Sequence, residues 1–127
     1  MRTAEEWIKQ STYDFETAEY MFNGGRYFYS VFMCHLCIEK MLKGLYHVKF
    51  DNLPPKNHNL IYFVEKLELK LINKHLDFIG ELNLASVATR YPEDLTQISK
   101  EFTQIKTKQI LDNTKELLQW LKNELVK

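Results

Sequence analysis

The sequence contains few of the residues that interrupt regular structure or cross-link a chain. Only 4 glycines, 3 prolines and 2 cysteines occur among its 127 residues. Two cysteines exclude a disulfide-rich scaffold, and so little glycine and proline is typical of long helices with few turns. No apolar run approaches the ~20 residues of a membrane span, and no apolar signal region follows Met1. We therefore expect a cytoplasmic protein with no role in a membrane.

An excess of charge of either sign is also absent. Lysine plus arginine number 17 and aspartate plus glutamate number 17, whereas a dedicated duplex-DNA binder is usually basic. Hydrophobic residues make up 45% of the chain and charged residues 27%, as in ordinary globular proteins. We expect one domain over residues 1–127 with one hydrophobic core, and no duplex-DNA partner.

Signals for helix ends and apolar residues at helical spacing divide the chain into five helices. Thr3-x-x-Glu6 has the spacing of a capping box, and Asn23-Gly24-Gly25 should end the first helix. Further apolar stripes predict a helix over about 27–48 and a short helix capped by Asn57. They also predict a helix ending before Pro92, with apolar residues Leu76, Ile79, Leu82, Leu84 and Val87, and a helix over about 99–124 that begins its stripe with Phe102 and Ile105. No segment shows the period-two alternation of a strand. We expect an all-α, up-and-down four-helix bundle with one additional short helix.

The second predicted helix has a face that begins aromatic and ends charged. At about 100° per residue, one arc holds Tyr29, Phe32, Leu36, Glu39, Lys40, Lys43 and His47. Glu39 and Lys43 are spaced i,i+4, so they either stabilise the helix as a pair or face a cleft. Asp14 falls within the apolar stripe of the first helix and needs a partner there. We interpret Asp14 as a structural acceptor.

The common motifs of enzyme and metal sites are missing. There is no Gly-rich phosphate loop, no Gly-x-Ser-x-Gly elbow and no His-Glu-x-x-His helix. Cys34-x-x-Cys37 falls inside a predicted helix, whereas redox pairs lie at a helix N-terminus. No second pair completes the four ligands of a zinc site. We interpret the cysteines as core thiols and expect no metal.

Four motifs follow one another along the chain. They are Tyr29-x-x-x-Met33, His35-x-x-x-Glu39-Lys40-x-Leu42-Lys43-Gly44, His58-Asn59-Leu60 and Arg90-Tyr91-Pro92-Glu93-Asp94. Together they resemble the HEPN family, the higher eukaryotes and prokaryotes nucleotide-binding domain, over nearly the whole chain. The resemblance implies a helical bundle that commonly dimerises. It also implies either pairing with a minimal nucleotidyltransferase, in a prokaryotic toxin–antitoxin-like pair, or a metal-independent ribonuclease.

The motif of the ribonuclease members is absent from this chain. Those members carry an arginine followed four to six residues later by a histidine, which suits phosphate binding and acid–base chemistry. No histidine follows His75, so Arg90 lacks such a partner, and Arg26 precedes His35 by nine positions. Arg2 has no histidine near it either. We therefore assign no catalytic residue and favour a protein that is not an enzyme.

The main functional hypothesis is a non-catalytic homodimeric module beside the second helix. It would bind a nucleotide such as ATP, or a nucleotidyltransferase partner. In the candidate site, the cations available for phosphate are Lys40, Lys43 and Arg90. The tyrosines that could stack on a base are Tyr29 and Tyr91. Two neighbouring polar residues, Glu39 and His58, complete the site.

Two alternatives stay open. The first is a ribonuclease acting on RNA with a displaced acid–base residue, either His58 or His35. The second is a structural interaction bundle in which the charged arc is a salt-bridge network that orients the helices. The 8 Phe, 7 Tyr and 2 Trp exceed what one small core requires, which predicts an interface.

Overall fold

The computed structural model describes residues 3–126, which form six α-helices and contain no strand. The helices are α1 Ala4–Asn23, α2 Tyr27–Phe50, α3 Leu60–Lys66, α4 Asn73–Arg90, α5 Leu95–Glu101 and α6 Gln104–Glu124. The predicted all-α fold is confirmed. The four long helices are accompanied by two short ones rather than one. Arg2 lies outside the described residues.

The second short helix arises because the segment predicted as one helix over 99–124 is broken. Thr103 between α5 and α6 has extended backbone angles, and its Oγ1 accepts a hydrogen bond from the Lys106 N–H at 3.2 Å. Thr103 is thus the N-cap of α6. The helical spacing of Phe102 and Ile105 concealed the break, yet Ile105 is 75% exposed and contributes nothing to the core.

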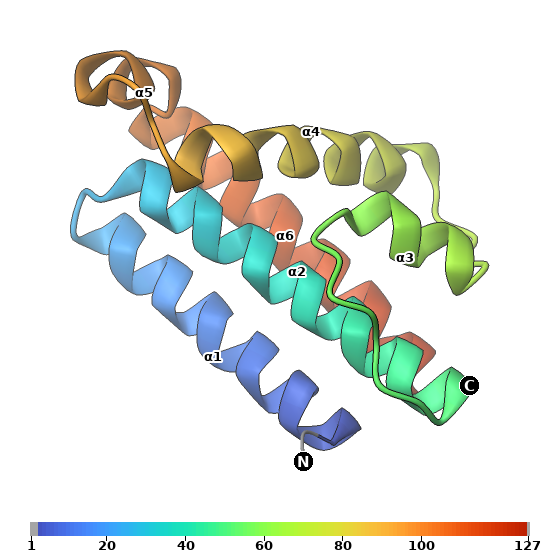
Figure 1. The fold of residues 1–127 in the computed structure, drawn as a ribbon. Coiled ribbons are helices and arrows are strands. Elements are labelled where there is room, and N and C mark those ends of the chain that lie inside the picture. Colours follow the sequence, from blue (N-terminus) through green and yellow to red (C-terminus); the bar gives the residue numbers. More distant parts are fainter. Residues whose placement is uncertain (1–2, 127) are drawn as a thin grey trace.

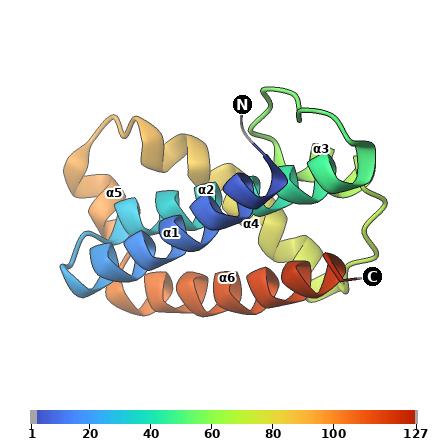
Figure 2. The same ribbon diagram turned by 90° about the horizontal axis from the view of Figure 1, so that it is seen from below.

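Three long helices, α1, α2 and α6, run side by side, and α4 lies across α2 (Figure 1). The view from below shows α1 in front of α2, with α6 beside them (Figure 2). Helix α5 lies near the α1–α2 turn, whereas α3 lies near the opposite end of α2. Because α2 contacts every other helix, its first half is apolar on nearly all sides, as expected at the centre of a bundle.

Both ends of α1 follow the signals in the sequence. The Thr3 Oγ1 accepts a hydrogen bond from the Glu6 N–H at 3.1 Å. Gly25 has φ +76°, a left-handed conformation that glycine adopts without strain, so the chain can turn back into α2. Two buried serines then join the helices: Ser30 donates to the Ala18 carbonyl and Ser11 donates to the Cys37 carbonyl, both at 2.7 Å.

The cysteines are core thiols, as predicted. Cys34 and Cys37 are 1% and 0% exposed, and neither is in a disulfide. Burial raises the pKa of each thiol to about 12. Both groups are therefore protonated and unreactive in the folded protein.

The apolar residues predicted for α4 point in two directions. Ile79 and Leu82 are buried in the core, but Leu84 and Val87 are 79% and 76% exposed. The outer face of α4 is therefore apolar and open to solvent. Within residues 3–126, no helix is both long and apolar enough to cross a membrane.

Candidate functional site

Glu39 of α2 is the centre of a buried polar cluster. It is 4% exposed, and Lys43, one turn later, donates a hydrogen bond to its Oε2 at 3.0 Å. His58 reaches the same carboxylate from the loop before α3, with Nδ1 at 3.0 and 3.1 Å from the two oxygens. An ionised carboxylate only accepts hydrogen bonds, so Nδ1 of His58 donates. These partners compensate the burial of the carboxylate.

Both lysines of the candidate site are already paired with carboxylates. Lys43 is 6% exposed, and its ammonium lies 5.4 Å from the ring centroid of Trp7 and 5.9 Å from that of Phe63. Lys40 points to α1 instead, where its Nζ lies 2.8 Å from the carboxylate of Asp14. Asp14 thus has the partner that its burial requires. Neither ammonium is an unpaired positive charge.

His35 lies beneath the cluster and has no access to solvent. It is 0% exposed, with Nδ1 at 3.8 Å from Oε1 of Glu39. Burial lowers the pKa of His35, and this effect exceeds the opposing influence of the Glu39 carboxylate. His35 is therefore neutral at neutral pH and cannot meet a ligand at the surface.

The position of His58 is set by two asparagines that hold the start of α3. Asn59 is the N-cap, with Oδ1 accepting from the Ile61 N–H at 3.0 Å. From α4, Asn83 accepts from the Leu60 N–H at 2.9 Å and donates to Asn59 Oδ1 at 2.7 Å. The prediction of Asn57 as N-cap is wrong. Because α3 begins only at Leu60, Asn57 reaches no N–H of the helix and instead accepts from the Asn59 N–H at 2.8 Å.

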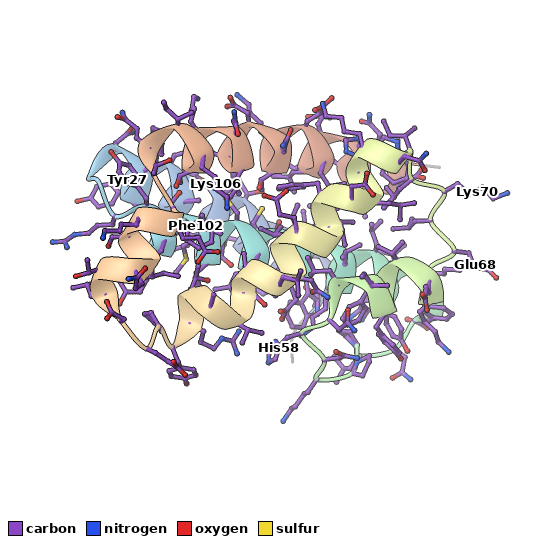
Figure 3. All side chains as sticks on the ribbon, turned by 90° about the horizontal axis from the view of Figure 1, so that it is seen from above. Tyr27, His58, Glu68, Lys70, Phe102 and Lys106 are labelled. Atoms are coloured by element: carbon purple, nitrogen blue, oxygen red, sulfur yellow. The ribbon has the colours of Figure 1, made fainter. Side chains whose placement is uncertain are left out.

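The exposed part of His58 faces a groove between α3 and α4 (Figure 3). The groove has a volume of about 600 Å³ and is lined by His58, Asn59, Ile61, Gly80, Asn83, Leu84, Ser86 and Val87. Its walls are mainly apolar. The His58 side chain is 60% exposed, so its ring remains accessible although Nδ1 is bound.

Arg90 is the last residue of α4. It comes two helical turns after Asn83 and lies on the same side of the helix. Its guanidinium carbon lies 5.3 Å from the ring centroid of Phe32. Among residues 3–126, no carboxylate lies within 4 Å of this guanidinium. Tyr29, one turn before Phe32 on α2, is 45% exposed, and Tyr91 is 83% exposed. Arg90 is thus a cation without a carboxylate partner among the described residues, and the accessible Tyr91 follows it directly in the chain.

The structure therefore divides the predicted site residues. Glu39, Lys43 and His58 form one cluster, while Arg90 contacts Phe32 of α2 at the end of α4, away from that cluster. Lys40 belongs to neither group because it contacts α1. Sequence reasoning missed Asn83, whose role depends on a contact between α3 and α4 that no local pattern reveals. The described residues contain no group of three His, Cys, Asp or Glu side chains that could hold a metal ion.

Comparisons with known proteins agree with this fold. The model of the HEPN domain matches residues 4–125. The crystal structure of TT1696 from Thermus thermophilus superposes with a TM-score of 0.82 at 20% identity, over 97% of this chain and 98% of that one. ST0689, described as an archaeal HEPN homologue, superposes with a TM-score of 0.73 at 24% identity, over 98% of each chain. No curated protein matches at a significant level. Since the family model spans nearly the whole chain, the protein belongs to the HEPN family.

Proposed function

We propose that this HEPN-domain protein is a non-catalytic nucleotide-binding module. The observation that carries the proposal is Arg90, which has no carboxylate partner among the described residues and contacts Phe32, one turn after Tyr29 on α2, at the end of the helix that provides Asn83 and Val87 to the groove. A guanidinium is planar and suits the oxygens of a phosphate group, and exposed aromatic rings suit a nucleobase. The groove volume falls in the range of small-molecule sites.

The ion pairs indicate that the two lysines of the predicted site have a structural role. Lys43 is held by Glu39 and Lys40 by Asp14, so a phosphate would have to displace a buried carboxylate to bind either ammonium. Arg90 faces no such competition. We therefore assign phosphate binding to Arg90.

Calorimetric titration with nucleotides, ATP among them, tests the proposal. We expect saturable binding that weakens at least about tenfold in Arg90→Gln, because a charge-assisted hydrogen bond is lost. Arg26→Gln is the matched control, since Arg26 is an exposed arginine before α2 and should not affect binding. Absence of binding by every nucleotide, or equal losses in both variants, contradicts the assignment.

We also propose that the module acts as a homodimer and pairs with a minimal nucleotidyltransferase, as its family membership suggests. The surplus of exposed large hydrophobic side chains supports such interfaces, with Tyr20, Leu84 and Ile105 each more than 70% exposed. Light scattering coupled to gel filtration should give twice the 15.2 kDa of one chain. A mass of one chain at every concentration contradicts the homodimer.

A second candidate, a metal-independent ribonuclease, is favoured by the pairing of Glu39 with His58. A carboxylate bound at Nδ1 orients the imidazole and leaves Nε2 to accept or release a proton. His35 does not fit this role because it is completely buried. Cleavage of RNA in EDTA that disappears in His58→Ala would support an enzyme, whereas no cleavage at high protein concentration would exclude one.

A further inference from the structure

We infer that the site at Arg90 prefers a nucleotide with a single phosphate group, a nucleoside monophosphate, over nucleoside diphosphates and triphosphates. This inference rests on the proposed nucleotide-binding function and adds the class of ligand. Two observations support it. The lysines of the candidate site are paired with carboxylates, and acidic residues follow Arg90 in the chain.

Only one cation near the site is available for phosphate. Lys40 and Lys43 are compensated by carboxylates at 2.8 and 3.0 Å, and His58 faces the carboxylate of Glu39. Of the three cations of the candidate site, Lys40, Lys43 and Arg90, only Arg90 has no carboxylate within 4 Å among the described residues. One guanidinium can bind one phosphate group through two parallel hydrogen bonds. The other two groups of a triphosphate would find no second unpaired cation among the described residues of the candidate site.

Lys56, an exposed lysine of the loop before α3, is close in sequence to His58 rather than to Arg90. Lys56 precedes His58 by two residues, and His58 contacts Glu39 of α2. Arg90 instead contacts Phe32, which precedes Glu39 by two helical turns, roughly 10 Å along α2. The contacts that His58 and Arg90 make on α2 are therefore two helical turns apart, with Lys56 next to His58 in the chain.

Acidic residues lie on the other side of Arg90. Glu93 and Asp94 follow shortly after it, and together with Glu101 they line a second hollow of about 420 Å³, which Val87, Ala88 and Tyr91 also line. No lysine or arginine lines this hollow. A second or third phosphate that extended from Arg90 toward α5 would meet like charge.

A nucleoside monophosphate fits these features together. Its one phosphate group would bind Arg90, and its nucleoside would lie against Tyr29 or Tyr91 or enter the apolar groove beside Val87. In this arrangement no phosphate approaches the acidic hollow.

Titration with AMP, ADP and ATP in EDTA at low salt tests the inference, with inorganic phosphate as a further ligand. We expect AMP to bind most tightly and ATP at least about tenfold more weakly. Arg90→Gln should weaken AMP binding at least about tenfold, while Arg26→Gln leaves it unchanged. Added magnesium should reduce the preference for AMP, because the metal neutralises the extra phosphates.

A second experiment removes the acidic residues, which should strengthen the binding of ATP relative to AMP. The double variant Glu93→Gln, Glu101→Gln should bring the affinities of ATP and AMP to within about threefold of each other. Asp94 is kept, since its Oδ1 caps α5 by accepting from the Gln97 N–H at 3.0 Å. Circular dichroism verifies that each variant folds.

The possible failures can be told apart. If no nucleotide binds, both the proposed function and this inference are wrong. If ATP binds as tightly as AMP in EDTA, the inference is wrong and the proposed function stands. If inorganic phosphate binds as tightly as AMP, the nucleoside contributes nothing and the ligand class is wrong.

Discussion

At the scale of single residues, Glu39 is the acceptor at the centre of the buried polar cluster. It accepts from Lys43 and His58 while 4% exposed, so Glu39→Gln leaves the buried ammonium of Lys43 without a counter-charge. Breaking a buried ion pair costs about 3–5 kcal/mol. We expect a loss of that order in the free energy of unfolding, measured with urea. Glu65→Gln, at an exposed position of α3, should change it by less than about 0.5 kcal/mol. Equal effects of the two substitutions would refute the role of Glu39.

His35 makes stability depend on pH. Burial lowers its pKa in the folded protein, so below about pH 6.5 the unfolded chain binds a proton that the folded protein does not. Stability therefore falls as the pH decreases below that value, by up to about 1.4 kcal/mol per pH unit from this group. Urea titrations between pH 8 and pH 5 should show a shallower loss in His35→Gln than in the parent. Parallel curves would show that His35 is not the group responsible.

At the scale of helices, two glycines inside helices should respond oppositely to alanine. A Cβ at Gly80 of α4 meets no atom within 4 Å, so Gly80→Ala should stabilise the protein by about 0.5–1 kcal/mol through helix propensity. A Cβ at Gly44 of α2 would lie 3.0 Å from Ile8 Cγ1 and 3.5 Å from Trp7 Cβ. Overpacking of about 1–3 kcal/mol then cancels or exceeds the gain. Thermal unfolding of both variants checks this, and a stabilised Gly44→Ala would disprove close packing of α1 on α2.

The helices also show how far sequence reasoning extends. Capping by Thr3 and the left-handed turn at Gly25 are local, so they could be predicted, as could the Glu39–Lys43 pair at i,i+4. The contact between His58 and Glu39 spans 19 residues and depends on where the loop folds. The break at Thr103 was missed because Thr103 lacks the glutamate that completes a capping box.

The other misses have the same origin in tertiary contacts. Helical spacing placed Leu84 and Val87 with the core residues of α4, although they are exposed. Periodicity reports where an apolar side chain lies around a helix, but not whether another helix covers it. Likewise, the i,i+4 spacing reveals the carboxylate partner of Lys43, but only the packing of α1 on α2 shows that Lys40 is paired with Asp14.

At the scale of the whole molecule, the two thiols report on global unfolding. Cys34 and Cys37 lie in α2, which contacts every other helix, and both are almost completely buried. We expect a thiol reagent to label them together, at a rate governed by the free energy of global unfolding. In denaturing urea both should react at once. Much faster labelling of one thiol in the native protein would mean that the bundle opens locally.

The segment between α2 and α3 is held at its two ends and exposed to solvent between them. Asp51 closes α2 with φ +48° and an N–H bonded to the His47 carbonyl, and the His58–Asn59 pair is held by α2 and α4. Between these anchors, Leu53, Pro55 and Lys56 are exposed. Exposed loop tips of this kind accept foreign sequence with little effect on the fold. The junction of Leu53 and Pro54 is thus a place for an epitope or a fluorescent label in this small bundle.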